Sequence, residues 1–390
     1  MRLAIITTHP IQYYAPVFKL LHKREDIDVK VFYTWGKDAC NKFDPGFNQV
    51  IEWDIPLLDG YPYEWVINTS KDPGTHHFGG IVNPTIIEEL ELWRADAILI
   101  YGWAFNSHLK IIRHFKKKIP IYFRGDSTLL DAQKGLKSIF RSIFLKWVYK
   151  HIDYAFYVGT NNKNYYLKFA LSQNQLKFAP HAVDNDRFAF DKTKDANLLR
   201  DQLGIKEEEI LILFAGKLEE KKAPVQLLNA FNALKATGVH LLYVGNGSLE
   251  NQLKMSAKHA KNIHFIDFQN QSFMPVAYQA CDIFCLPSKG PNETWGLAIN
   301  EAMACGKAIL SSDIVGSAVD LVNPGFNGEI FRAGDQTDLV HRLNVLLQKG
   351  KNGLRTMGAN SREIIKNWNF EKQVNVIGSI IENEERSTIY

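Results

Sequence analysis

Short apolar runs alternate with amphipathic stretches through both halves of this 390-residue chain, and this alternation restricts the fold most. Strands of a parallel sheet covered by helices on both faces appear as continuous apolar runs, and the covering helices carry one apolar face. The pattern predicts an α/β chain of two Rossmann-like domains, each a doubly wound parallel sheet. The predicted strands are 3–7, 29–33, 97–101, 119–123 and 154–158 in the first half, and segments near Ile210, Leu241, Ile263, Ile283 and Ala308 in the second.

The boundary between the domains is predicted where the alternation lapses into a polar stretch, between Pro180 and Asn197. We expect a first domain over 1–185, a second over 186–368 and a final helical segment over 369–390. Helices are expected at 225–235 and 295–305.

Composition places the chain among folded enzymes, because 46% of its residues are hydrophobic and 23% are charged. No apolar stretch is long enough to span a bilayer, and the first residues lack the features of a secretory signal, so we expect a cytoplasmic protein. The four cysteines show no Cys-x-x-Cys pair, which favours reduced thiols over disulfides or metal ligands: Cys40, Cys281, Cys285 and Cys305.

Two carboxylates, Glu293 and Glu301, lie eight positions apart in NETWGLAINEAMA. A helix beginning near Gly296 would carry Glu301 on its second turn, leave Glu293 in the preceding loop and aim unpaired backbone N–H groups at a ligand. Upstream, Lys217 and Lys222 follow an apolar strand and could neutralise an anion from the opposite side. The arrangement predicts a site for a phosphate ester that bears hydroxyl groups.

Simpler interpretations exist for each of these residues. The lysines could form a solvated loop, and the carboxylates could be a surface acid and a helix-stabilising acid. The lysines, however, follow the carboxyl end of a buried-type strand, which is the edge where open parallel sheets bind ligands. The Gly245–Asn246–Gly247 turn could admit a phosphate or ribose, but Glu250 stands at the third glycine position of a nicotinamide-binding motif and argues against that cofactor.

Five segments of the second half resemble, in order, motifs of the retaining glycosyltransferases of family 4. They are APHAVDNDRF (179–188), GKLEEKKAP (216–224), LLYVGNGSLE (241–250), ACDIFCLPS (280–288) and NETWGLAINEAMACGKAIL (292–310), which carries the Glu-x7-Glu signature. The resemblance extends over residues 177–335. It implies the GT-B fold, with two Rossmann-like domains facing a cleft, an acceptor-binding first domain, a nucleotide-sugar-binding second domain and a last helix that crosses back to the first.

The same resemblance implies a role for each candidate residue. Lys217 and Lys222 would hold the diphosphate of the donor, with backbone amides near Gly296 and Leu297. Glu301 would bind the ribose hydroxyls, and Glu293 would bind the transferred sugar. The remaining donor-site candidates are Gly216, Gly245, Gly247, Asn270 in the loop that meets the nucleobase, Thr294 and Trp295, where packing of Trp295 between strand and helix is an equal alternative.

On the acceptor side, Asp126 is a candidate carboxylate, with capping of the next helix as its alternative. The implied activity is transfer of a hexose-type sugar from a UDP- or GDP-linked donor to a glycan or lipid-linked hydroxyl, in polysaccharide or lipopolysaccharide synthesis. No cofactor and no metal are expected. A sugar-nucleotide epimerase of the same fold and an inactive nucleotide-sugar-binding or scaffolding protein remain alternatives.

Residues 110–150 hold eleven basic and two acidic residues. Within them, Phe140, Phe144 and Trp147 fall at helical spacing among lysines and arginines. This face could rest on an anionic membrane, as a peripheral protein on the inner face of the plasma membrane would, or it could be buried in the core. Nucleic acid is not an expected partner, because the basic bias is local and no binding motif accompanies it.

Overall fold

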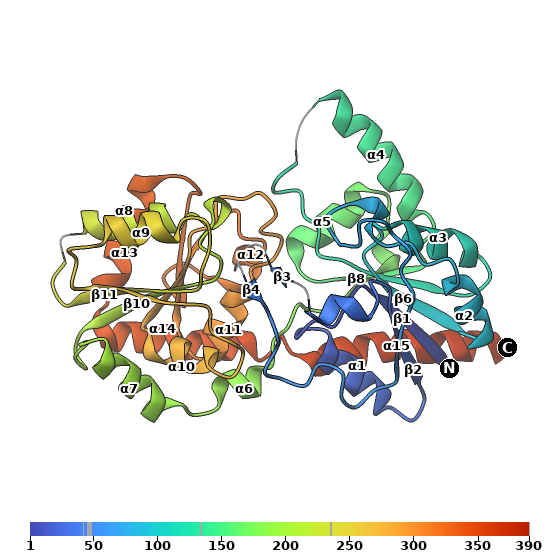
Figure 1. Ribbon diagram of the computed structural model, residues 1–390, viewed down its shortest axis with the longest axis horizontal. Coiled ribbons are helices and arrows are strands. Elements are labelled where there is room, and N and C mark those ends of the chain that lie inside the picture. Colours follow the sequence, from blue (N-terminus) through green and yellow to red (C-terminus); the bar gives the residue numbers. More distant parts are fainter. Residues whose placement is uncertain (42, 45–48, 133–134, 235, 390) are drawn as a thin grey trace. The chain divides into compact units, whose positions relative to one another are not determined.

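The computed structural model describes residues 1–41, 43–44, 49–132, 135–234 and 236–389, and it divides into two compact units (Figure 1). Unit 1 comprises Met1–Lys42, Ile55–Pro180 and Phe370–Tyr390, and unit 2 comprises Phe43–Asp54 and His181–Asn369. The chain therefore passes from unit 1 to unit 2 between Pro180 and His181. The segment 43–54 belongs to unit 2, which the sequence pattern did not anticipate.

Unit 1 contains a seven-stranded parallel sheet in the order β5-β2-β1-β6-β7-β8-β9. Its central strands are fully buried because both faces are covered by helices, which explains their uninterrupted apolar sequence. Its strands are β1 (Arg2–Thr7), β2 (Asp28–Tyr33), β5 (Tyr63–Trp65), β6 (Ala97–Tyr101), β7 (Ile121–Arg124), β8 (Tyr154–Tyr157) and β9 (Leu176–Phe178).

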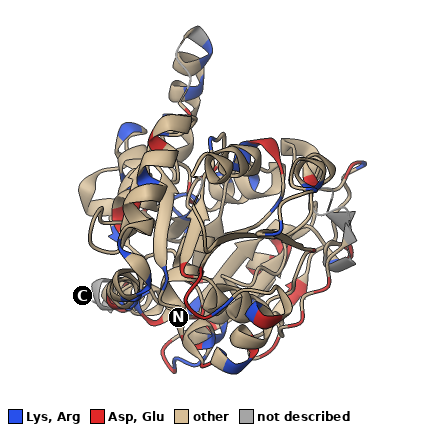
Figure 2. Ribbon diagram, turned by 90° about the vertical axis from the view of Figure 1, so that its left-hand side faces the viewer, with Lys and Arg blue, Asp and Glu red and all other residues tan. Residues whose placement is uncertain are grey.

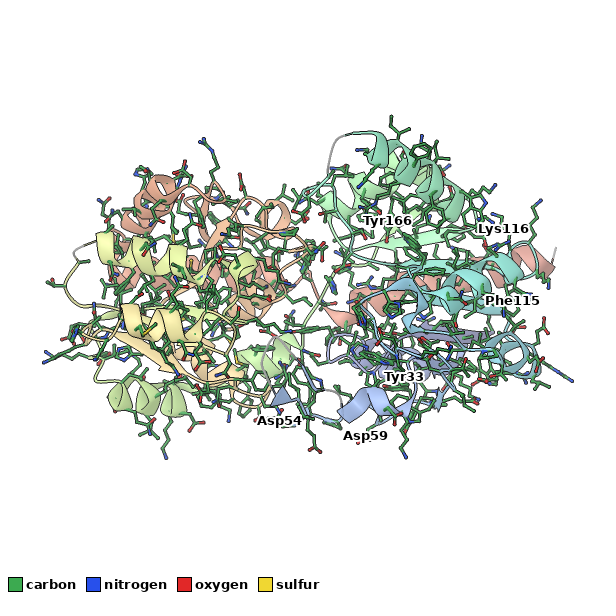
Figure 3. All side chains as sticks on the ribbon, turned by 45° about the horizontal axis from the view of Figure 1, so that its top comes forward. Tyr33, Asp54, Asp59, Phe115, Lys116 and Tyr166 are labelled. Carbon is green, nitrogen blue, oxygen red and sulfur yellow. The ribbon has the colours of Figure 1, made fainter. Side chains whose placement is uncertain are left out.

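The helices of unit 1 include the last helix of the chain. They are α1 (Ala15–His22), α2 (Ile86–Leu92), α3 (Asn106–Phe115), α4 (Leu136–Tyr149), α5 (Thr160–Lys168) and α15 (Phe370–Ile389). Helix α15 packs along α1, and Arg24 pairs with Glu382 at 2.6 Å. The aromatic core beneath these helices includes Tyr33 and Tyr166, both fully buried (Figure 3).

Unit 2 contains a six-stranded parallel sheet in the order β12-β11-β10-β13-β14-β15. Its strands are β10 (Ile210–Ala215), β11 (Val239–Val244), β12 (Ile263–Ile266), β13 (Ile283–Leu286), β14 (Ala308–Ser312) and β15 (Gly328–Phe331). Its helices are α6 (Asn185–Ala189), α7 (Thr193–Gln202), α8 (Pro224–Ala233), α9 (Glu250–Ser256), α10 (Met274–Ala280), α11 (Ala298–Ala304), α12 (Ala318–Leu321), α13 (Gln336–Leu347) and α14 (Gly350–Ile365). A short antiparallel pair, β3 (Phe43–Asp44) and β4 (Gln49–Val50), also belongs to this unit.

The prediction of two doubly wound α/β domains is confirmed, and all ten predicted strands exist. The helix expected over 295–305 is shorter, because it begins only at Ala298. Gly296 lies at φ +84°, a left-handed conformation that a helix cannot continue through. The helix expected over 225–235 begins at Pro224 and ends at Ala233, and Lys235 lies outside the described residues. Strands β5, β9 and β15, of three or four residues, were not predicted, and neither were the two-residue strands β3 and β4.

Candidate functional site

Lys222 and Glu293 form an ion pair at the carboxyl edge of the sheet of unit 2. Lys222 ends a short 3₁₀ helix that follows β10, and Glu293 lies in the loop after β13. The Nζ atom of Lys222 is 2.5 Å from Oε2 of Glu293, and the same oxygen accepts a 2.7 Å hydrogen bond from the Ser288 hydroxyl. Glu293 is 8% exposed, so a charged carboxylate is held by a cation and a hydroxyl at the edge where parallel sheets bind ligands.

Glu301 is also buried, and Tyr278 of α10 holds it in place. The Tyr278 hydroxyl donates a 2.7 Å hydrogen bond to Oε2 of Glu301. Because α11 begins at Ala298, Glu301 lies on its first turn, and the prediction of the second turn was wrong. A carboxylate on the first turn is stabilised by the positive end of the helix dipole.

Trp295 and Thr294 connect the two carboxylates, and both are held by packing. Trp295 is buried, lies 5.2 Å from the Trp368 ring between centroids, and donates from Nε1 to Oδ1 of Asn300 at 2.9 Å. Trp295 therefore packs against Trp368, and its contact with a sugar stays a prediction. Thr294 is pressed against Gly316, where an added Cβ atom would lie 1.7 Å from the Thr294 carbonyl oxygen. Only glycine fits there.

Gly245 and Gly247 are explained by the close approach of two loops. A Cβ atom on Gly245 would lie 2.2 Å from the carbonyl oxygen of Gly216, and one on Gly247 would lie 2.5 Å from that of Leu218. The Leu218 amide donates to the Asn246 carbonyl at 2.9 Å, which joins the loop after β10 to the loop after β11. These glycines thus position the segment that carries Lys217, a half-buried side chain at this edge.

Asn270 lies in the loop that follows β12, and its side chain binds the segment before Ile55. Its Nδ2 donates to the Glu52 carbonyl at 2.6 Å, and its Oδ1 accepts from the Gln271 amide at 2.8 Å. Asp54, labelled in Figure 3, accepts a hydrogen bond from the Ser272 hydroxyl in the same loop. The loop predicted to meet a nucleobase is therefore hydrogen-bonded to residues 52–54.

In unit 1, Asp126 lies in the loop after β7, beside Tyr14. Burial, and then the negative charge of Asp126, raise the pKa of Tyr14. The next helix, α4, has Gly135 at its N-cap position and receives no side-chain cap, so Asp126 does not cap it. Asp126 thus remains a half-buried carboxylate at the carboxyl edge of the sheet of unit 1.

Sequence analysis missed Ser288, Tyr278 and Gly316. Ser288 ends the quoted segment ACDIFCLPS two residues beyond β13, and this position was the available signal for it. Tyr278 lies 23 residues from Glu301 on a separate helix, and Gly316 is identified only by the contact with Thr294. Neither the Tyr278–Glu301 hydrogen bond nor the Gly316–Thr294 contact produces a local pattern in the sequence.

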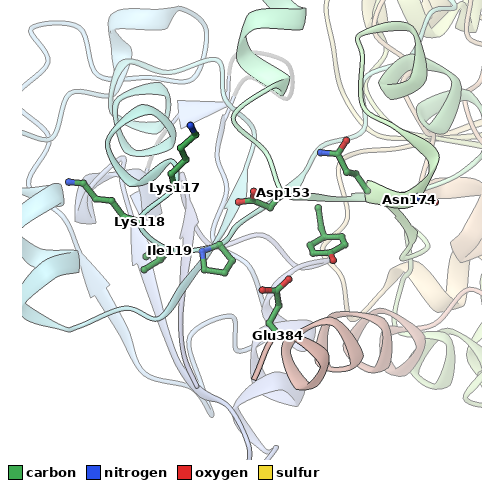
Figure 4. Close-up of a pocket in the computed structure, with 9 residues that line it drawn as sticks. Lys117, Lys118, Ile119, Asp153, Asn174 and Glu384 are labelled. Atoms are coloured by element: carbon green, nitrogen blue, oxygen red, sulfur yellow. The ribbon is translucent and has the colours of Figure 1, made fainter. Parts of the chain in front are cut away.

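Two other features lie apart from this edge. Cys281, Cys285 and Cys305 are buried and free, and burial raises the pKa of the Cys281 thiol to about 12. A pocket of about 480 Å³ in unit 1 is lined by Lys117, Lys118, Ile119, Pro120, Asp153, Tyr154, Asn174, Gln175 and Glu384 (Figure 4). It opens at the amino ends of β7 and β8, opposite to the edge where parallel sheets bind ligands.

The two parallel-sheet units, of seven and six strands, define the class: they match the GT-B fold of glycosyltransferases. The structural match to Anabaena HepE in complex with UDP covers 98% of this chain and 100% of the HepE chain, with a TM-score of 0.74 and 16% sequence identity. The match to sucrose-phosphate synthase from Thermosynechococcus elongatus covers 99% of this chain and 100% of the synthase chain, with a TM-score of 0.72 and 18% sequence identity. The expectation of a GT-B fold is confirmed.

By sequence, residues 195–379 match the family described as glycosyl transferases group 1. A D-inositol 3-phosphate glycosyltransferase of Stackebrandtia nassauensis is 28% identical over 188 residues, which are 45% of this chain and 41% of that protein. A phosphatidyl-myo-inositol mannosyltransferase of Mycobacterium tuberculosis is 28% identical over 138 residues, which are 35% of this chain and 34% of that protein. The match thus spans less than half the length of these curated relatives.

Proposed function

We propose that this protein is a retaining glycosyltransferase that moves a hexose-type sugar from a UDP- or GDP-linked donor to a hydroxyl of a glycan or lipid-linked acceptor. The observation that carries the proposal is the pairing of Lys222 with Glu293 at the carboxyl edge of unit 2, where the buried Glu301 also lies on the first turn of α11. Ion-paired and hydrogen-bonded carboxylates at this edge suit a ligand that carries both phosphate and hydroxyl groups.

In this proposal Lys222 exchanges partners when the donor binds. The diphosphate takes the ammonium group, with Lys217 beside it, and Glu293 becomes an acceptor for the hydroxyls of the sugar. As the glycosidic bond breaks, negative charge grows on the leaving diphosphate, and fixed cations stabilise it in place of a metal. Glu301 accepts hydrogen bonds from the ribose hydroxyls while Tyr278 holds its other side. Asp126 is the proposed carboxylate on the acceptor side.

The known proteins support a nucleotide-sugar donor by analogy. HepE structures are described with UDP and with UDP-glucose, and the curated relatives are glycosyltransferases that act on inositol-containing acceptors by name. Two further neighbours of the same fold are named for lipopolysaccharide synthesis. We therefore place the activity in the assembly of cell-surface polysaccharide or lipopolysaccharide at the cytoplasmic face of the membrane.

The test is release of nucleoside diphosphate from a panel of UDP-, GDP- and ADP-sugars in the presence of a chelator. Nuclear magnetic resonance of the released or transferred sugar reports its anomeric configuration, which stays that of the donor in a retaining reaction. An epimerase would return a changed nucleotide sugar, and an inactive binding protein would release nothing. Either result would overturn the proposal.

We further propose that α4 holds the enzyme on an anionic membrane. Among the described residues, no helix combines the length and apolarity needed to cross a bilayer. Helix α4, however, extends away from the sheet of unit 1 (Figure 1), and it carries exposed apolar side chains. Phe140 is 72% exposed, Ile143 is 62% and Ile139 is 57%.

Among the described side chains of α4, those buried in the core lie on its last turns: Leu145, Val148 and Tyr149. Residues three and four apart share a helix face, so Ile139, Phe140 and Ile143 form one stripe. Lys137, Arg141 and Lys146 are exposed on the same helix, which carries basic residues but no acidic ones (Figure 2). An apolar stripe with basic neighbours is the composition of helices that lie in the interface of anionic lipid.

A further inference from the structure

In a loop of unit 1, two imidazoles lie beside one carboxylate. This loop is far in sequence from the candidate site. Nε2 of His76 and Nε2 of His77 each lie 3.2 Å from Oδ2 of Asp72. The donor atoms of the three residues all lie within 4.8 Å of one another. Two neutral imidazole nitrogens and one carboxylate oxygen are a ligand set that zinc and neighbouring divalent transition metals prefer.

Two of the donor separations fit such an ion. With metal–ligand distances of about 2.0–2.2 Å, the edge of a coordination tetrahedron is about 3.3–3.6 Å. Each imidazole Nε2 lies 3.2 Å from Oδ2 of Asp72, close to that edge. The side chains of Asp72, His76 and His77 are 72%, 59% and 39% exposed, so an ion can reach them without unfolding the loop.

The loop that presents these residues is closed by its own hydrogen bonds. At its base, Oδ1 of Asn68 accepts from the Val82 amide at 2.9 Å, and the Thr69 amide donates to the Val82 carbonyl at 2.8 Å. Further in, the Ser70 hydroxyl donates to the Gly79 carbonyl at 2.7 Å. Because this frame holds the turn, the donors are gathered before any ion binds, which reduces the entropy that binding costs.

We propose that Asp72, His76 and His77 form a binding site for one divalent transition-metal ion of the zinc class, with a fourth position open to water. The site lies in unit 1 and uses none of the residues proposed to hold the donor. It is therefore independent of the proposed transferase activity, and nucleotide binding in the presence of chelator does not test it.

The experiment is calorimetric titration of ZnCl₂ into the full chain, prepared without a histidine tag, at pH 7.5. We expect one site, bound at least tenfold more weakly in His76→Ala and in His77→Ala. His114→Ala is the matched control, because His114 lies 2.9 Å from Glu91 in the same unit with no second imidazole described beside it. It should bind zinc like the parent chain.

Circular dichroism without metal should show all variants folded, since the altered side chains are substantially exposed. Hydrogen exchange over residues 69–82 should slow when zinc is added to the parent chain and stay unchanged in His77→Ala. Absence of zinc binding by the parent chain, or equal affinity in the parent, His76→Ala and His77→Ala, would overturn the proposal.

Discussion

The ammonium nitrogen of Lys222 lies 2.5 Å from the carboxylate of Glu293, a group that is almost completely buried. The two residues are 71 positions apart in sequence, and both were assigned to a ligand rather than to each other. Each therefore satisfies the charge of its partner. Under the proposed function, a donor that takes Lys222 must offer an anion, and one that takes Glu293 must offer hydroxyls.

Removing Lys222 should impair turnover more than binding. Lys222→Ala is expected to cost about 2 to 4 kcal/mol of transition-state stabilisation, the range for loss of one preorganised charge donor. It should also lower the free energy of unfolding by about 1–3 kcal/mol, because a buried carboxylate loses its cation. Steady-state kinetics and denaturant unfolding measure the two effects.

Lys221→Ala is the control for that substitution. Lys221 lies 3.3 Å from Glu219 in a more exposed pair, so its loss should change stability by less than about 1 kcal/mol. If Lys222→Ala turned over donor at the parent rate, Lys222 would not belong to the site.

The Tyr278 hydroxyl should act through Glu301. Tyr278→Phe removes the 2.7 Å hydrogen bond, so we expect nucleotide affinity to fall about three- to tenfold and stability to fall by about 1 kcal/mol. Tyr166→Phe, which removes a 2.8 Å bond to the Gly125 carbonyl in unit 1, should cost similar stability and leave nucleotide affinity unchanged. Equal nucleotide affinities in Tyr278→Phe and Tyr166→Phe would show that the Tyr278 hydroxyl does not contribute to donor binding.

The strands could be predicted because parallel strands buried on both faces consist of continuous apolar residues, as in ILILFA of β10. The position of Glu293 and the lysines at the carboxyl edge of the sheet could be predicted because they follow such strands, and their roles there stay predictions. The Lys222–Glu293 pair and the Tyr278–Glu301 bond could not, since each depends on tertiary packing between distant segments. The first-turn position of Glu301 was missed because Gly296 takes a left-handed conformation that delays the helix.

Helix α4 should bind anionic vesicles through its basic residues. Replacing Lys137, Arg141 and Lys146 together by Gln is expected to weaken binding by about 3 kcal/mol, near 1 kcal/mol for each charge at the surface. Vesicles of phosphatidylglycerol and phosphatidylcholine, separated by sedimentation, give the measurement.

A second variant tests the apolar stripe. Phe140→Ser with Ile143→Ser should weaken vesicle binding without unfolding the protein, because both side chains are exposed. Leu92→Ser, at an exposed position of α2, is the control and should bind like the parent. A parent protein that stayed in the supernatant with anionic vesicles would dispose of the membrane proposal.

Stability should fall in acid through His108. This side chain is fully buried between the Thr34 hydroxyl and the Gly102 carbonyl, each at 2.8 Å, and burial lowers its pKa to about 4. In the unfolded chain this histidine has its ordinary pKa of about 6.5. Between pH 6.5 and pH 4 the unfolded state therefore binds more protons than the folded state. The free energy of unfolding decreases over this range as the pH falls, by about 3 kcal/mol for this residue. The stabilisation is complete above pH 6.5.

His108→Asn should flatten that dependence, measured by urea unfolding at pH 7 and pH 4.5. His264, whose pKa burial also lowers to about 4, would supply a remaining slope. An unchanged slope in His108→Asn would show that this residue does not stay neutral when buried.

The most direct test is calorimetric binding of UDP, GDP, ADP and their sugar conjugates to the parent chain, to Glu301→Ala and to Glu293→Gln, with chelator present. We predict binding of one base, lost in Glu301→Ala because the buried carboxylate proposed to accept hydrogen bonds from the ribose is removed. Glu293→Gln should keep its nucleotide affinity and lose transfer. No binding of any nucleotide by the parent chain, or equal loss of binding and transfer in both variants, would contradict the assignment of this edge as a donor site.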